Sequence, residues 1–127
     1  MDKFVCNKGF TLLEIIATLV ILSILAAIAV PKYVSLDESA RQRAIDAGIA
    51  ELNGRETLTW SNEKISVSGW VSDAKTFGEV DKYLGDEYQW DTGNPDQNGG
   101  TLTFKESHPV ALSRVESTNE RPGSWSR

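Results

Sequence analysis

The residue whose chemistry stands out most is Glu14, an acid that interrupts a long apolar run near the start of the chain. Residues 10–30 contain 21 amino acids, and Glu14 is their only charged member. A carboxylate inside a bilayer costs about 2.5–3.5 kcal/mol at the centre on insertion scales, and less near the edge. An acid retained at such a position usually marks a function, so Glu14 is the first candidate functional residue.

A helix is the element that must position Glu14. At about 1.5 Å per residue, a helix over residues 10–30 is roughly 31 Å long, which matches a bilayer hydrocarbon core of about 30 Å. The run is rich in Ile and Val, but a lone lipid-exposed strand could not satisfy its backbone groups. Within residues 15–30 the only polar residues are Thr18 and Ser23, which can hydrogen-bond to the preceding turn of a helix. The run therefore predicts a membrane-spanning helix.

Pro31 ends the apolar run and lacks an N–H group, so it either kinks or ends the helix. Because the following residues again have a helical pattern, we expect one long helix with a kink at Pro31. Asn53-Gly54 is the expected stop, with Trp60 as an alternative end.

The residues Lys8-Gly9-Phe10-Thr11-Leu12-Leu13-Glu14, with the apolar run behind them, resemble the N-terminus of type IV pilins and type II secretion pseudopilins. The resemblance covers about residues 1–45. It implies that residues 1–9 are a leader, which a prepilin peptidase removes after Gly9. Phe10 would then be the N-methylated first residue, and Glu14 would guide subunits into a filament.

The same resemblance implies an α+β fold, in which a long N-terminal helix packs against a small antiparallel β-sheet head. The expected domains are the leader (1–9), a transmembrane and filament-core helix (10–30), and a continuing amphipathic helix with a globular head (31–127). The implied function is a structural pilin that polymerises with itself into a helical filament. The implied partners are the prepilin peptidase, the assembly machinery of the inner membrane, and membrane lipid before assembly.

The charges near the apolar run predict its orientation in a bacterial inner membrane. Lys3 and Lys8 precede the run, whereas Asp37 and Glu38 follow it. Positive charges favour the cytoplasmic side. We therefore expect a cytoplasmic leader and a periplasmic head, and later an extracellular pilus or a periplasmic pseudopilus.

Two alternatives stay open at this stage. The chain could be a secretion pseudopilin or a minor pilin, or a membrane-tethered binding module that never polymerises. Its only cysteine is Cys6, in the expected leader. The mature chain would lack the disulfide of many type IV pilins, which favours pseudopilins or disulfide-free pilins. The residues after Pro31 look pilin-like and favour a pilus. The sequence leaves the filament's ligand and biological role open.

The composition argues against several other functions. The net charge is −5, so sequence-independent binding to nucleic acid is disfavoured. His108 is the only histidine, and no serine stands in a nucleophile elbow. We expect no enzyme and no required cofactor.

A turn-rich loop offers a possible exception for calcium. Asp91, Asn94, Asp96 and Asn98 present oxygen ligands at positions i, i+3, i+5 and i+7. Calcium takes six to eight oxygens, but this spacing is not that of an EF-hand. The same residue types occur in ordinary hairpin loops. A plain loop is therefore the main interpretation, and calcium binding is the alternative.

The remaining head elements follow from capping residues and alternation. Ser72 or Asp73 is expected to cap a short helix at about residues 74–84, which Gly85 ends. Alternating residues predict three strands in an antiparallel meander, at about 88–90, 100–105 and 109–115. Residues 61–70 form a loop or edge strand, and residues 118–127 form a polar tail whose Trp125 can fold back. The aromatic residues expected in the core are Trp60, Trp70, Phe77, Tyr83, Tyr88, Trp90 and Phe104, with a sugar-binding or electron-transfer set as the alternative.

Overall fold

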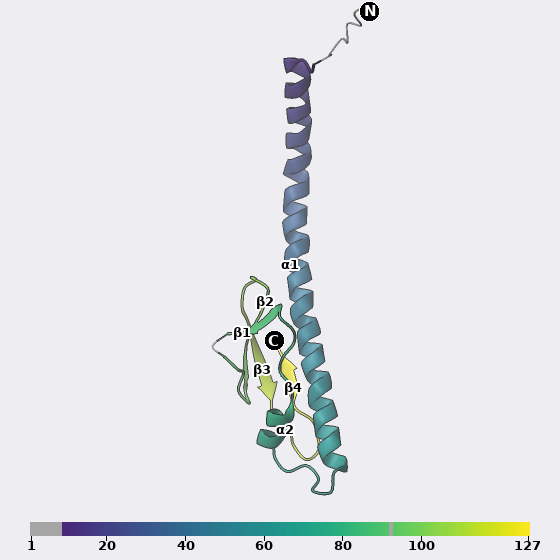
Figure 1. Ribbon diagram of the computed structural model, residues 1–127, viewed down its shortest axis with the longest axis vertical. Coiled ribbons are helices and arrows are strands. Elements are labelled where there is room, and N and C mark those ends of the chain that lie inside the picture. Colours follow the sequence, from purple (N-terminus) through teal and green to yellow (C-terminus); the bar gives the residue numbers. More distant parts are fainter. Residues whose placement is uncertain (1–8, 92) are drawn as a thin grey trace, which may run out of the picture. The chain divides into compact units, whose positions relative to one another are not determined.

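The computed structural model describes residues 9–91 and 93–127. Most of the expected leader, with Lys3, Cys6 and Lys8, lies outside the described residues. The elements in chain order are α1 (Leu12–Ile65), α2 (Asp73–Glu79), β1 (Tyr88–Trp90), β2 (Gly99–Phe104), β3 (Val110–Val115) and β4 (Ser124–Ser126) (Figure 1). The expected α+β class, a long N-terminal helix with a small antiparallel sheet, is confirmed. The chain divides into two compact units, which meet within α1 between Glu38 and Ser39 and are described separately below.

The first unit contains the apolar half of α1, and all its described residues are exposed. The hydroxyl of Thr18 donates to the Glu14 carbonyl at 2.8 Å, and that of Ser23 donates to the Leu19 carbonyl at 2.7 Å. Both polar side chains are thus satisfied within the helix, as expected. The helix continues through Pro31, so it does not end there, and the kink stays a prediction.

Among the described residues, α1 is the helix that is long and apolar enough to cross a membrane. Its most apolar 18-residue window has a mean hydropathy of 2.7, and none of that window is buried. The core helix of a soluble protein would have a mostly covered apolar stretch. An exposed apolar stretch near the N-terminus has the character of a membrane span, and a signal sequence has the same character.

The expected helix stop at Asn53-Gly54 is wrong, because α1 runs on to Ile65. Glycine disfavours a helix interior by only about 1 kcal/mol relative to alanine, and packing overrides that amount. Leu52, Glu56 and Glu63 are all buried on this part of the helix. The first five residues of the expected 61–70 loop consequently belong to α1.

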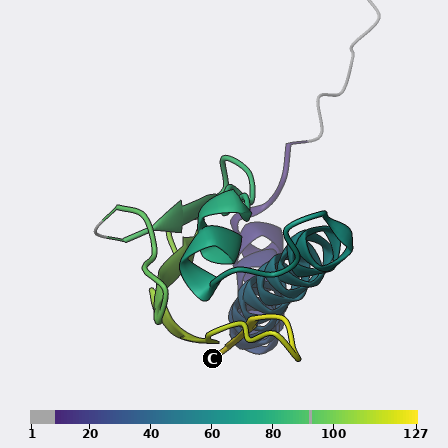
Figure 2. The same cartoon turned by 90° about the horizontal axis from the view of Figure 1, so that it is seen from below.

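The second unit builds its core between α1 and a four-stranded sheet. The strands pair antiparallel in the order β1-β2-β3-β4, which confirms the expected meander and adds one strand to it. Figures 1 and 2 show the sheet and α2 beside the second half of α1. The buried cluster joins both layers and consists of Ile45, Leu52, Leu102, Leu112 and Trp125.

The added strand β4 lies in the expected polar tail, and Trp125 does fold back. Its side chain is only 3% exposed, and Arg114 of β3 lies opposite it. The side chain of Asn53 on α1 fixes this strand. Asn53 accepts from the Trp125 N–H at 2.6 Å and donates to the Trp125 carbonyl at 3.1 Å.

Replacing Asn53 with alanine should therefore loosen β4 from the helix. Two hydrogen bonds at about 0.5–1.5 kcal/mol each predict a loss of about 1–3 kcal/mol in unfolding free energy. Near-ultraviolet circular dichroism of the full chain in micelles can follow head unfolding. Leu58→Ala is the control, because Leu58 is exposed on the same helix. Equal stability of the two variants would contradict this role of Asn53.

Helix α2 begins as expected but ends early. Ser72 is its N-cap and accepts a hydrogen bond from the Lys75 N–H. The helix was expected to reach Leu84, yet it ends at Glu79, where the buried Val80 turns to an extended conformation. The Lys82 ammonium donates to the Phe77 and Val80 carbonyls at 2.6 and 2.9 Å, which satisfies this helix end.

The expected aromatic core is confirmed for four of its seven residues. Phe77, Tyr88, Trp90 and Phe104 are partly buried and pack against the buried cluster. Trp60 and Trp70 are half-buried but are not among the residues that pack against the buried cluster. Tyr83 is instead 61% exposed, and its hydroxyl donates to Asp86. Because α2 ends before Tyr83, this side chain no longer shares the inward face of the helix.

A buried ionic network ties α1, α2 and β3 together at Arg114. The guanidinium donates to both Glu56 oxygens, through Nε at 2.6 Å and Nη2 at 3.0 Å. It also donates to both Asp73 oxygens, at 2.9 and 2.8 Å. The Arg114 and Glu56 side chains are completely buried. Trp125 adds a hydrogen bond from Nε1 to Glu56, and Ser117 adds bonds from its N–H and hydroxyl to Asp73.

These contacts set the charge states of the network. Burial alone would lower the pKa of Arg114, but hydrogen bonds to Asp73 and Glu56 outweigh it and raise that pKa. Burial alone would raise the pKa of Asp73, but hydrogen bonds from Arg114 and Ser117 outweigh it and hold that pKa below its ordinary value. Arg114 and Asp73 are therefore both stabilised in their ionised forms.

Candidate functional site

Glu14 caps the start of its own helix together with Thr11. The Thr11 N–H donates to Glu14 Oε2 at 2.8 Å, and the Glu14 N–H donates to Thr11 Oγ1 at 3.2 Å. Since α1 begins at Leu12, Thr11 is the N-cap residue and Glu14 is the third helical residue. This reciprocal pair is a capping box, and the negative charge also suits the positive end of the helix dipole.

Sequence reasoning missed the role of Thr11, although a signal for it was present. A Thr followed three residues later by Glu, just before an apolar run, is the pattern of a capping box. The hydropathy of the run indicates a functional role for Glu14, but it does not indicate that Glu14 also caps the helix. The two roles act on the same carboxylate, so experiments on Glu14 must separate them.

The residues Gly9, Phe10 and Glu14 lie at the exposed end of the first unit. Phe10 is 86% exposed, and a Cβ added at Gly9 would meet nothing within 4 Å. Phe10, which precedes α1, lines a shallow depression of about 230 Å³ together with Glu14, Ile15, Thr18 and Leu19 of the helix. Phe10 and Glu14 therefore lie on the same surface of the first unit.

The Glu14 carboxylate can still accept a further partner. In the part of the chain that the structure describes, Oε2 accepts the Thr11 N–H and Oε1 accepts no hydrogen bond. An ionised carboxylate has about four acceptor positions. A cation that approaches this face would therefore meet a free carboxylate oxygen surrounded by apolar side chains.

The loop offered for calcium has other contacts for its carboxylates. Asp96 Oδ1 accepts the N–H groups of Asn98 and Gly99 at 2.8 and 3.1 Å. Asp91 Oδ1 accepts the Thr103 hydroxyl at 3.0 Å. Across residues 9–91 and 93–127, no three His, Cys, Asp or Glu side chains gather as a metal site. Calcium binding at Asp91, Asn94, Asp96 and Asn98 stays a prediction.

Comparison with known proteins finds similarity at the N-terminus of the chain. The family described as the Prokaryotic N-terminal methylation motif matches residues 6–30. The type IV narrow pilus major component PilA5 of Thermus thermophilus is 51% identical over 43 residues. That match covers 34% of this chain and 37% of the relative, so it spans little more than a third of either protein. No solved structure matches.

The matched region contains Gly9, Phe10, Thr11, Glu14 and the start of the exposed apolar helix. It lies within the residues, about 1–45, over which the sequence resembles type IV pilins. The chain therefore carries the prokaryotic N-terminal methylation motif, and the resemblance of its first third to type IV pilins is confirmed.

Proposed function

We propose that this chain is a structural subunit of a type IV pilus-like filament. The observation that carries the proposal is the methylation motif at residues 6–30, placed at the start of an exposed apolar helix that Glu14 caps. A filament needs such a helix, because an apolar surface shielded by lipid in the membrane can be shielded by neighbouring helices after assembly. The chain acts as a building block and not as an enzyme.

The proposed life cycle begins in the bacterial inner membrane. The apolar half of α1 spans the bilayer, with residues 1–9 in the cytoplasm and the head in the periplasm. A prepilin peptidase cuts after Gly9, and Phe10 becomes the methylated N-terminus. Assembly machinery in the inner membrane then extracts the subunit into a helical homopolymer, in which the amine of Phe10 pairs with Glu14 of a neighbour.

Replacing Gly9 with phenylalanine should block processing. The peptidase must fit the residue before the cut, and a large side chain there should clash with it. The structure around Gly9 is open, so the substitution has no folding cost of its own. Mass spectrometry of the membrane fraction should find the full-length variant and a wild-type chain shortened by nine residues.

Gly54→Ala is the matched control for Gly9→Phe, because Gly54 also has open space around it but lies far along α1. This variant should be processed like the wild type. An unprocessed wild-type chain in a cell that contains prepilin peptidase would favour the alternative of a membrane-tethered binding module.

A type II secretion pseudopilin or minor pilin is the second candidate. The observation that favours it is the lack of any cysteine in residues 10–127. The similarity to a major pilus component favours the pilus. Immunogold electron microscopy separates the two, because a major pilin labels surface filaments along their length and a pseudopilin stays below the surface.

A further inference from the structure

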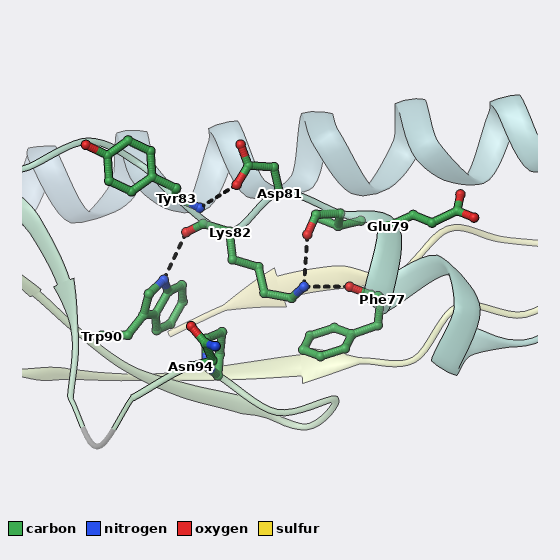
Figure 3. Close-up of a pocket in the computed structure, with 10 residues that line it drawn as sticks. Phe77, Glu79, Asp81, Lys82, Tyr83, Trp90 and Asn94 are labelled. Carbon is green, nitrogen blue, oxygen red and sulfur yellow. Dashed lines mark hydrogen bonds between the residues drawn. The ribbon is translucent and has the colours of Figure 1, made fainter.

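A polar and aromatic pocket of the head lies between α2, the segment before β1, and the loop before β2. It has a volume of about 540 Å³, within the usual range for small-molecule sites of about 300–1,000 Å³. Figure 3 shows the residues that give it its chemistry, which are Phe77, Glu79, Asp81, Lys82, Trp90 and Asn94. None of them belongs to the filament-forming half of α1.

Trp90 gives this pocket a rigid apolar wall. Its Nε1 donates to the Lys82 carbonyl at 3.0 Å, and its ring packs against Trp125 at 5.6 Å between centroids. The loop before β2 lies tightly on the same ring. Gly100 of β2 lies close to both, since a Cβ added there would come within 2.9 Å of Pro95 in that loop and 3.2 Å of the Trp90 ring. A fixed aromatic wall loses little entropy when a ligand binds.

The polar groups around that wall include both donors and acceptors. The ammonium of Lys82 has three N–H donors and uses two of them on the Phe77 and Val80 carbonyls. Glu79 and Asp81 are exposed and offer carboxylate oxygens. The exposed amide of Asn94 makes no hydrogen bond within the described residues, so its donor and acceptor are both free for a ligand.

The charges of the pocket disfavour ionic ligands. The Lys82 ammonium lies 4.0 Å from the Phe77 ring centroid, which is the place where a ligand cation would bind an aromatic face. Glu79 and Asp81 line the same pocket and repel an anion. A neutral ligand therefore suits this pocket if it has an apolar face to pack on the Trp90 indole and several hydroxyls to hydrogen-bond the polar groups.

We propose that this pocket binds a neutral saccharide, with a sugar ring against Trp90 and its hydroxyls hydrogen-bonded to Asn94 and Glu79. The site is independent of the filament function and would let the head contact glycans or polysaccharide. Asn94 is then a ligand-binding residue of this pocket and not only a member of the loop offered for calcium.

Saturation-transfer NMR on the full chain in lauryldimethylamine oxide micelles tests the proposal, because this detergent has no sugar headgroup. The neutral probes are lactose, cellobiose, maltose and diacetylchitobiose. Glucosamine and glucuronic acid are the charged probes. We expect at least one neutral disaccharide to receive saturation and to shift the Trp90 indole N–H resonance. Neither charged probe should bind more tightly than that disaccharide.

Asn94→Ala and Asn98→Ala form the decisive pair. Both asparagines are exposed in the same loop, but only Asn94 lines the pocket. Asn94→Ala should weaken disaccharide binding by about fivefold or more, while Asn98→Ala should leave it unchanged. The proposal is overturned if no neutral probe binds the wild type, if a charged probe binds more tightly, or if the two variants bind alike.

Discussion

Arg114→Ala is expected to lower the unfolding free energy of the head by about 3–5 kcal/mol. The substitution leaves the Glu56 carboxylate completely buried without its cation. Small domains have only about 5–15 kcal/mol of total stability, so the variant should be largely unfolded or degraded in cells. Near-ultraviolet circular dichroism in micelles reports on this, because Trp125 packs within the same network.

Arg127→Ala is the matched control, since Arg127 also pairs with an acid, Asp46 at 3.1 Å, but on the surface. Exposed pairs contribute about 0–1 kcal/mol, so this variant should remain close to the wild type. The double variant Glu56→Leu/Arg114→Met removes both charges of the buried pair and should recover part of the loss, because Asp73 still lacks its cation. Equal stability of Arg114→Ala and Arg127→Ala would contradict a stabilising role for the network.

The same network predicts how head stability depends on pH. The pKa of Asp73 is lower in the folded protein than its ordinary value of about 3.9. Its contribution is therefore fully present above about pH 4, and it is lost as pH falls through the folded pKa. Asp73→Asn should reduce this loss below about pH 4, which acid titrations followed by tryptophan circular dichroism can measure.

Glu14→Gln is expected to reduce filament assembly strongly while leaving insertion and cleavage intact. Glutamine can keep the capping bond with the Thr11 N–H, because capping boxes accept Glu or Gln. It removes the charge that the proposed pairing requires. An α-amine has a reference pKa of about 7.7–8.0 and is mostly cationic near neutral pH. Burying it without an acid costs about 3–5 kcal/mol, which corresponds to at least about a hundredfold in equilibrium.

Thr11→Val separates the charge of Glu14 from its role in the helix cap. This variant removes the Thr11 hydroxyl that accepts the Glu14 N–H, and it keeps the carboxylate. Losing a cap costs typically about 1 kcal/mol, so assembly should be affected much less than in Glu14→Gln. The amount of filament is measured by electron microscopy and by immunoblots of sheared filaments, from cells that lack the wild-type subunit. Normal filaments from Glu14→Gln would contradict the pairing, and equal defects in both variants would assign the effect to the cap.

The start of the fold could be predicted because composition dictates it. An apolar run with one charge leaves few alternatives to a long helix, and α1 has that form. Strand β3 was also predictable, because its residues alternate between the core and the surface. Thr11 was missed although its spacing from Glu14 was visible, since the apolar run was interpreted by its hydropathy and not by its capping residues.

The end of α1 could not be predicted, because its last turns are polar. From the sequence, a glutamate such as Glu56 is expected at the surface. It is buried because it pairs with Arg114, which lies 58 positions away in the sequence. The same is true of β4, a three-residue strand that Asn53 holds from 72 positions away. The pocket around Trp90 was hidden for a related reason, as it combines residues from α2, β1 and the loop before β2.

The identity and methylation of the N-terminal residue of this chain in assembled filaments test the proposed function most directly. Filaments sheared from cells would be dissociated, and the N-terminal peptide of this chain sequenced by mass spectrometry. The proposal predicts a chain that begins at N-methylated Phe10 and lacks residues 1–9. Assembled material that retains Met1, or filaments that do not contain this chain although it is made, would contradict it.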